Sequence, residues 1–162
     1  MPSSREMDAG GLLICRFQAD LFSSSLELPI GSADFIKRFI HSPLCYELDT
    51  MGIATKPMQP RAFIAEWKAK LKPTNGPRWS AEELHWVGYV YRYWAYVDGV
   101  PMKRLYSRFP PAQMRRFYPL YHGLDPAAAI DIWKKDWVKE DDMLYTLYRQ
   151  VVKNQRLKNF KR

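Results

Sequence analysis

Histidine and cysteine are the side chains with which this chain would carry out acid–base or nucleophilic chemistry, and they are few. His41, His85 and His122 fall in separate predicted elements, and no HExxH, P-loop, nucleophile-elbow or GxGxxG pattern accompanies them. Cys45 follows His41 by four residues, but the intervening Pro43 breaks the helix that would align them, and no third group is placed to orient the imidazole. We therefore predict no catalytic residue, no cofactor and a chain that is not an enzyme.

Metal binding finds equally little support in the spacing of ligating residues. His122 and Asp125 lie within one helical turn, but a site needs three or four converging ligands, so we predict no metal site. His122 instead precedes Gly123 at a predicted helix C-terminus, where a partly protonated imidazole complements the helix dipole. Cys15 and Cys45 show no CxxC spacing, and we interpret them as reduced structural thiols of a cytoplasmic protein.

The cations are the most informative charged groups because they are unevenly distributed. The net charge is +8, yet residues 1–98 are balanced and residues 125–148 carry more acids than bases. The surplus lies in two blocks without any acid, 99–124 and 149–162. The first block contains Lys103, Arg104, Arg108, Arg115 and Arg116, and the second contains Arg149, Lys153, Arg156, Lys158, Lys161 and Arg162. Such blocks predict an anionic partner, either an acidic protein face or a nucleic acid.

The two blocks predict different partners. In the first block the cations are accompanied by Met102 and Tyr121, which we expect to be exposed, so this segment is predicted to bind a protein. The segments beside Pro110 and Pro111 lack the short turn and exposed polar readers of a helix-turn-helix, so base reading is not predicted. The second block combines cations with amide side chains and Phe160 and is the better candidate for contacting DNA phosphates. Its alternative interpretation is a frayed helix end whose cations complement the dipole.

Proline and glycine divide the chain into short helical segments. The length of 162 residues fits one domain, and a hydrophobic fraction of 47% suffices for a packed core. No apolar run approaches the roughly 20 residues that span a bilayer, so we predict no membrane partner. We predict an all-α, single-domain bundle of about six or seven helices over residues 12–148. Residues 1–11 are predicted to be disordered, 149–162 to be a basic helix end or tail, and a short β element before residue 31 is left open.

Local signals predict where the helices begin. Ser32 is a candidate N-cap, and Ser80 with Glu83 forms a capping box that starts a helix over 81–98. The proline- and glycine-rich stretch 72–79 between these positions is predicted to be a loop.

The helix over 81–98 is apolar around most of its circumference, which predicts the central, buried helix of the bundle rather than a stacking platform. Trp86, Tyr89 and Tyr93 follow one apolar stripe, whereas His85, Gly88 and Arg92 form a polar seam on the remaining sector. Glycine within a helix costs on the order of 1 kcal/mol relative to alanine, so Gly88 indicates the close approach of another backbone. A buried Arg92 must be paired with an acid or extend to solvent.

Three stretches, 32–52, 85–99 and 117–125, carry a resemblance. The residues are Ser32, Phe35, Ile36, Phe39, Leu48, Asp49, Gly52, Trp86, Gly88, Tyr93, Tyr96, Gly99, Tyr118, Leu120 and His122. With this pattern, residues 32–133 resemble a family of small all-helical bacterial proteins encoded in toxin–antitoxin-like loci, some of which encode ADP-ribosyltransferase-like toxins. The resemblance implies an antitoxin or accessory role without enzymatic activity, and it implies no particular binding site.

Together, the charge blocks and the resemblance predict a non-enzymatic protein-binding module that neutralises a partner toxin by occlusion. The expected partner is a cognate protein encoded nearby, and a second copy of the chain is an alternative. The alternative function is nucleic-acid binding, with an autoregulatory role, through residues 103–116 and 149–162.

Overall fold

The computed structural model describes residues 5–50 and 59–137, together with residues 143, 147, 150, 151 and 154. Within these residues every regular element is a helix, so the all-α prediction is confirmed and the β alternative before residue 31 is wrong. The chain divides into two compact units, Met1–Gly123 and Leu124–Arg162, whereas the sequence predicted one domain over 12–148. No helix in the described part of the chain is both long and apolar enough to cross a bilayer.

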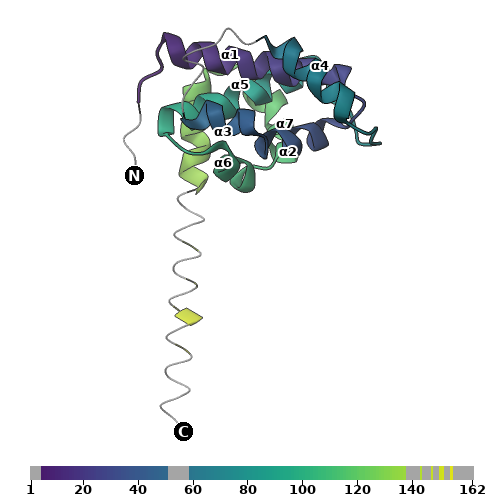
Figure 1. The fold of residues 1–162 in the computed structure, drawn as a ribbon. Coiled ribbons are helices and arrows are strands. Elements are labelled where there is room, and N and C mark those ends of the chain that lie inside the picture. Colours follow the sequence, from purple (N-terminus) through teal and green to yellow (C-terminus); the bar gives the residue numbers. More distant parts are fainter. Residues whose placement is uncertain are drawn as a thin grey trace. The chain divides into compact units, whose positions relative to one another are not determined.

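The first unit is built on two long helices, α1 and α5, that pack against each other (Figure 1). α5 also contacts α6 and α7, α4 lies against α1, and α2 contacts α3, α6 and α7. The bounds are α1 (Ala9–Ser24), the 3-10 helix η1 (Ser25–Glu27), α2 (Ser32–Ile40), α3 (Pro43–Thr50), α4 (Pro60–Lys70), α5 (Ala81–Asp98), α6 (Met102–Arg108) and α7 (Pro111–Tyr121). In the second unit residues 126–137 are helical, and the Asp125 carbonyl accepts the Ala129 N–H at 3.1 Å.

The N-terminal segment is ordered from residue 5, so the prediction of disorder over 1–11 is wrong for its described part. Asp8 caps α1, because its carboxylate accepts the Gly11 N–H at 2.7 Å. The segment is also held by the end of α5. The Arg5 N–H donates to the Val97 carbonyl at 2.7 Å, and the Tyr96 hydroxyl donates to Asp8 at 2.8 Å. These tertiary hydrogen bonds, which a polar composition does not reveal, order the segment.

The start of α2 differs from the prediction because its serine is used in a tertiary contact. Gly31 is the N-cap, and Ser32 is the first residue of the helix. The Ser32 hydroxyl accepts the N–H of Trp79 at 2.9 Å, and the Ser32 N–H donates to the carbonyl of Pro77 at 3.0 Å. The predicted loop before α5 is confirmed, and these bonds fasten it to the start of α2.

The capping box at the start of α5 is confirmed. The Glu83 N–H donates to the Ser80 hydroxyl at 3.1 Å, and the Ser80 N–H donates to the Glu83 carboxylate at 2.9 Å. The helix ends at Gly99, whose φ of 61° lies in the left-handed region that glycine adopts without a Cβ clash.

The most buried face of α5 includes part of the predicted polar seam. Gly88 and Arg92, from the polar seam, are fully buried, whereas Trp86, Tyr89 and Tyr93 are only half-buried. The cause is the packing of α1 on Gly88. A Cβ at this position would lie 2.9 Å from the carbonyl oxygen of Gln18 and 2.8 Å from Cγ of Phe22. The predicted close approach of another backbone at Gly88 is therefore confirmed.

Candidate functional site

Arg92 is the centre of a buried polar network that joins three helices. Its side chain is 1% exposed. From α5, Nη1 donates to Oδ1 of Asp49 on α3 at 2.6 Å, and Nε donates to Oε1 of Gln18 on α1 at 2.8 Å. Gln18 in turn donates to the carbonyl of Gly88 at 2.8 Å. Arg92 is therefore both buried and paired, which keeps a charge stable inside the core.

Asp49 extends the network to α6. Its two carboxylate oxygens accept the N–H of Met102, the first residue of α6, at 3.3 and 3.2 Å. An acid at this place satisfies a free N–H group at the start of α6 and complements the positive end of the helix dipole. The Arg92–Asp49 pair thus positions α6 and also joins α3 to α5 inside the core.

Met102 does not belong to an exposed interface, and its assignment as a partner-binding residue is wrong. Its side chain is 0% exposed, and its sulfur lies 3.4 Å from Nη2 of Arg92. Leu105 and Phe109 are buried as well. The sequence contained this signal, because the spacing of Met102, Leu105 and Phe109 places all three on one side of a helix.

The buried thiols are unreactive, as expected for structural cysteines. Burial raises the pKa of Cys15 to about 12 and that of Cys45 to about 11, although the nearby Arg92 guanidinium acts in the opposite direction. Both thiols are therefore protonated at neutral pH and are poor nucleophiles. His41, which was considered above as a catalytic partner of Cys45, is exposed. Its Nδ1 lies 2.8 Å from the carbonyl oxygen of Lys37.

The remaining residues of the first basic block differ in their exposure. Lys103, Arg104 and Arg116 are exposed, whereas Arg108, Arg115 and Tyr121 are half-buried. Arg115 pairs with Glu83 at 3.2 Å and lies 5.3 Å from the centre of the Trp79 ring. Burial alone would raise the pKa of Glu83, but its hydrogen bonds with Ser80 and Arg115 outweigh burial and lower that pKa. Arg115 thus holds α7 to the start of α5.

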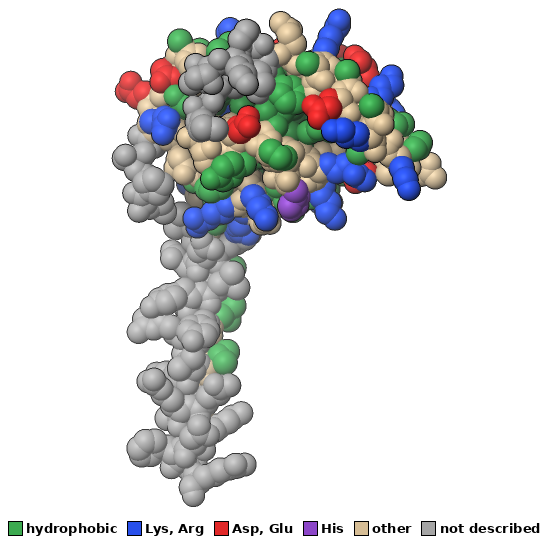
Figure 2. Space-filling model, in the orientation of Figure 1, with side chains coloured by type: hydrophobic (Ala, Val, Ile, Leu, Met, Phe, Trp, Pro, Cys, Tyr) green, Lys and Arg blue, Asp and Glu red, His purple; other side chains and the backbone are tan. Residues whose placement is uncertain are grey.

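The fold adds cations from α2 to those of α6. α2 packs beside α6, and its Lys37 and Arg38 are exposed. Figure 2 shows Lys and Arg side chains along the lower edge of the first unit, near the helices labelled α6 and α2 in Figure 1. We call the exposed Lys37, Arg38, Lys103 and Arg104 the basic face. The second predicted block, Arg149, Lys153, Arg156, Lys158, Lys161 and Arg162, lies outside the described residues.

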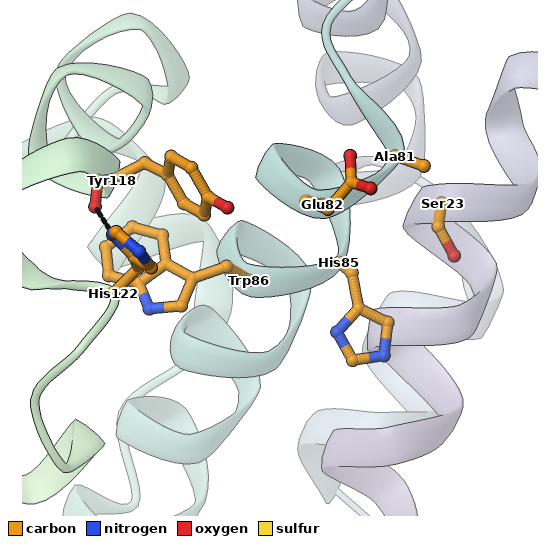
Figure 3. Close-up of a pocket in the computed structure, with 7 residues that line it drawn as sticks. All are labelled: Ser23, Ala81, Glu82, His85, Trp86, Tyr118 and His122. Carbon is orange, nitrogen blue, oxygen red and sulfur yellow. Dashed lines mark hydrogen bonds between the residues drawn. The ribbon is translucent and has the colours of Figure 1, made fainter.

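A surface pocket of about 410 Å³ lies between α1, α5 and α7 (Figure 3). It is lined by Ser23, Ala81, Glu82, His85, Trp86, Tyr118 and His122. His85, predicted as part of the polar seam, is half-exposed here, and its Nε2 lies 3.4 Å from Oδ1 of Asp20. His122 is the C-cap of α7, as the sequence predicted. Among the described residues no group of three or more histidine, cysteine or acidic side chains is arranged to hold a metal ion.

Comparison of the chain with models of protein families, with curated proteins and with solved structures finds no match. The basic face, the buried network and the pocket are therefore the features of this chain that bear on its function. Sequence analysis missed Gln18 and Asp49 as partners of Arg92, because residues far apart in the chain meet only after folding. It also missed the pocket, although both of its histidines had been singled out.

Proposed function

We propose that the chain is a non-enzymatic, cytoplasmic protein-binding module, an antitoxin or accessory protein that occludes a partner with an acidic surface. The observation that carries this proposal is the gathering of exposed cations from α2 and α6 on one basic face of a buried, hydrogen-bonded scaffold. The resemblance to proteins of toxin–antitoxin-like loci supports the same role.

A pre-organised scaffold favours occlusion because less conformational entropy is lost when the complex forms. The helix α6, which carries Lys103 and Arg104 of the basic face, is held in place by the core. Asp49 binds the first N–H of α6, and the buried Arg92 fixes Asp49. Tyr91 donates from its hydroxyl to the Phe109 carbonyl at the other end of α6. Burial, with a smaller contribution from Tyr106, raises the Tyr91 pKa well above its usual value, so the hydroxyl stays protonated and keeps donating. Both ends of α6 are therefore attached to the core.

The exposed side of α7 favours a protein over a nucleic acid as the partner. Arg116 and Leu120 stand four residues apart, so they lie on the same side of the helix. Leu120 is 72% exposed, next to the half-buried Tyr121. A large apolar side chain beside a cation suits an interface in which apolar contact and charge complementarity act together.

Co-expression with the product of the adjacent open reading frame tests the proposal. We expect a complex in size-exclusion chromatography and rescue of growth if that product is toxic. The double variant Lys103→Glu/Arg104→Glu should weaken the complex strongly, because it places acids opposite an acidic partner. The matched control, Arg61→Glu/Lys68→Glu, makes the same charge change at exposed positions of α4 and should leave the complex intact. Absence of a complex, or equal loss in both double variants, would contradict the proposal.

Nucleic-acid binding is the second candidate, favoured by the six cations of 149–162. Four or five phosphate contacts predict a log–log dependence of affinity on salt with a slope of about −4. Gel-shift titration with a mixed-sequence duplex at two salt concentrations measures this slope. The full-length variant with these six residues replaced by glutamine should lose the binding. Weak binding that persists unchanged in this variant would exclude the segment as the contact.

A further inference from the structure

We propose that the pocket between α1, α5 and α7 binds a guanidinium group, carried by a small molecule or by an arginine side chain. Three features of the lining support this assignment: it offers several acceptors, the Glu82 carboxylate has no partner among the described residues, and one wall is aromatic. This site is independent of the basic face, whose charge favours the opposite kind of ligand.

Each histidine of the pocket offers one acceptor nitrogen when its ring is neutral. Nδ1 of His122 lies 2.7 Å from the carbonyl oxygen of Tyr118, shown by the dashed line in Figure 3. A carbonyl only accepts, so in the neutral ring Nδ1 carries the proton and Nε2 is an acceptor. In His85, Nε2 lies 3.4 Å from the Asp20 carboxylate, which favours the neutral tautomer with the proton on Nε2, and in that tautomer Nδ1 is an acceptor.

The other polar side chains add acceptors of the same kind. The Ser23 hydroxyl donates to the carbonyl of Asp20 at 3.1 Å, so its lone pairs remain available to a ligand. Glu82 has no hydrogen-bond or ion-pair partner among the described residues, whereas the adjacent Glu83 is used by Ser80 and Arg115. The pocket therefore offers a carboxylate and several neutral acceptors, an arrangement suited to a cation with many N–H donors.

The aromatic wall selects a planar cation. Tyr118 stacks on the His122 ring, with centroids 4.6 Å apart and an interplanar angle of 21°. Trp86 meets Tyr118 edge to face at 5.8 Å, and Figure 3 shows these three rings together on one side of the pocket. A guanidinium stacks on such rings and fans its donors toward several acceptors. An alkylammonium is compact and strongly hydrated, so it fits this combination less well.

Titration of the full-length protein with agmatine, followed by the backbone amide resonances of residues 81–86, tests the assignment. We expect saturable shifts at these residues with agmatine and at least severalfold weaker binding of butylamine. The Glu82→Gln variant should bind agmatine about tenfold more weakly, because the amide oxygen can still accept a hydrogen bond but the negative charge of the carboxylate is lost. Glu47→Gln makes the same charge change at an exposed position of α3 that does not line the pocket, and it should bind normally.

A second arm distinguishes the two sources of the guanidinium. A capped Ala-Arg-Ala peptide that binds more tightly than agmatine indicates an arginine of a protein, whereas the reverse order indicates a small molecule. Either order supports the site. The assignment is wrong if neither ligand produces saturable shifts, if butylamine binds as tightly as agmatine, or if Glu82→Gln and Glu47→Gln bind agmatine equally. The basic-face variants should bind agmatine normally even if they no longer bind the partner protein. Failure of one proposal can therefore be distinguished from failure of the other.

Discussion

Arg92 and the cations of the basic face differ in environment far more than in chemistry. Arg92 is 1% exposed and is held by Asp49 and Gln18, whereas Lys103 and Arg104 are exposed on α6. In the core the removal of water makes an unpaired charge very unfavourable, so Arg92 has fixed partners. At the surface water and salt screen the charge, so we expect the exposed Lys103 and Arg104 to contribute little to stability. Burial therefore decides which cations of this chain build the fold and which can bind.

The pocket extends this comparison to the acids. Glu83 is committed to the capping box and to Arg115, while Glu82, one residue earlier, lines the pocket and has no such partner in the described residues. Neighbouring side chains in one helical turn thus take structural and ligand-binding roles according to the direction in which they point.

Asp49→Ala is expected to give the largest effect on the free energy of unfolding. It leaves the Arg92 charge buried without its acid and removes the acceptor at the start of α6, so we expect a loss of about 3–5 kcal/mol. Asp34→Ala is the matched control, because it removes the acid 3.5 Å from the exposed Arg38 and should cost less than about 1 kcal/mol. Urea unfolding of both variants measures the difference, and similar losses would refute the distinction between buried and exposed pairs.

Gly88→Ala is expected to have an intermediate effect. The added methyl group would overlap the Gln18 carbonyl and the Phe22 ring, where α1 and α5 pack beside the Arg92 network. Because a backbone carbonyl cannot move away without shifting α1, we expect the free energy of unfolding to fall by about 1–3 kcal/mol, despite the better helix propensity of alanine. Gly123→Ala, with no atom within 4 Å of the added Cβ, should change stability little in the same thermal or urea unfolding experiment. A stabilised Gly88→Ala protein would show that the helices are not packed this closely.

The double variant Lys103→Gln/Arg104→Gln is expected to have the smallest effect on stability, within about 0.5 kcal/mol of the unchanged protein. These residues are exposed, so their removal disturbs neither the core nor the Asp49 contact with α6. Circular dichroism during urea titration measures the change. A loss comparable with that of Asp49→Ala would mean that the basic face is part of the fold and not a free surface.

Signals confined to neighbouring residues predicted the fold well. The capping box at Ser80, the loop over 72–79, the end of α5 at Gly99 and the C-cap at His122 all depend on local hydrogen bonding and turn chemistry. Gly88 also indicated its own close contact, because a glycine within a helix needs a packing reason. The requirement that a buried Arg92 be paired followed from its charge alone.

The errors concern contacts between distant segments. Residues 5–11 are ordered by hydrogen bonds to the end of α5, and Ser32 serves the loop before α5 rather than its own helix. The aromatic pattern of α5 did not indicate which face is most buried, since the helix is apolar on nearly all sides and periodicity could not choose. Met102 was wrongly predicted to be exposed for a different reason. Its spacing from Leu105 indicated the buried side of a helix, but the neighbouring cations suggested an exposed segment.

The sequence by itself determined that the chain is helical, where α5 begins and ends, and that its positive charge is concentrated in blocks, since these follow from local propensity and composition. Only the tertiary structure decided that Asp49 and Gln18 pair with Arg92, that α2 adds cations beside α6, and that His85 and His122 line one pocket. The physical reason is that these groupings depend on which helix faces meet. The side chains involved are up to 74 residues apart in the chain, as Arg92 is from Gln18, and no local pattern encodes that meeting.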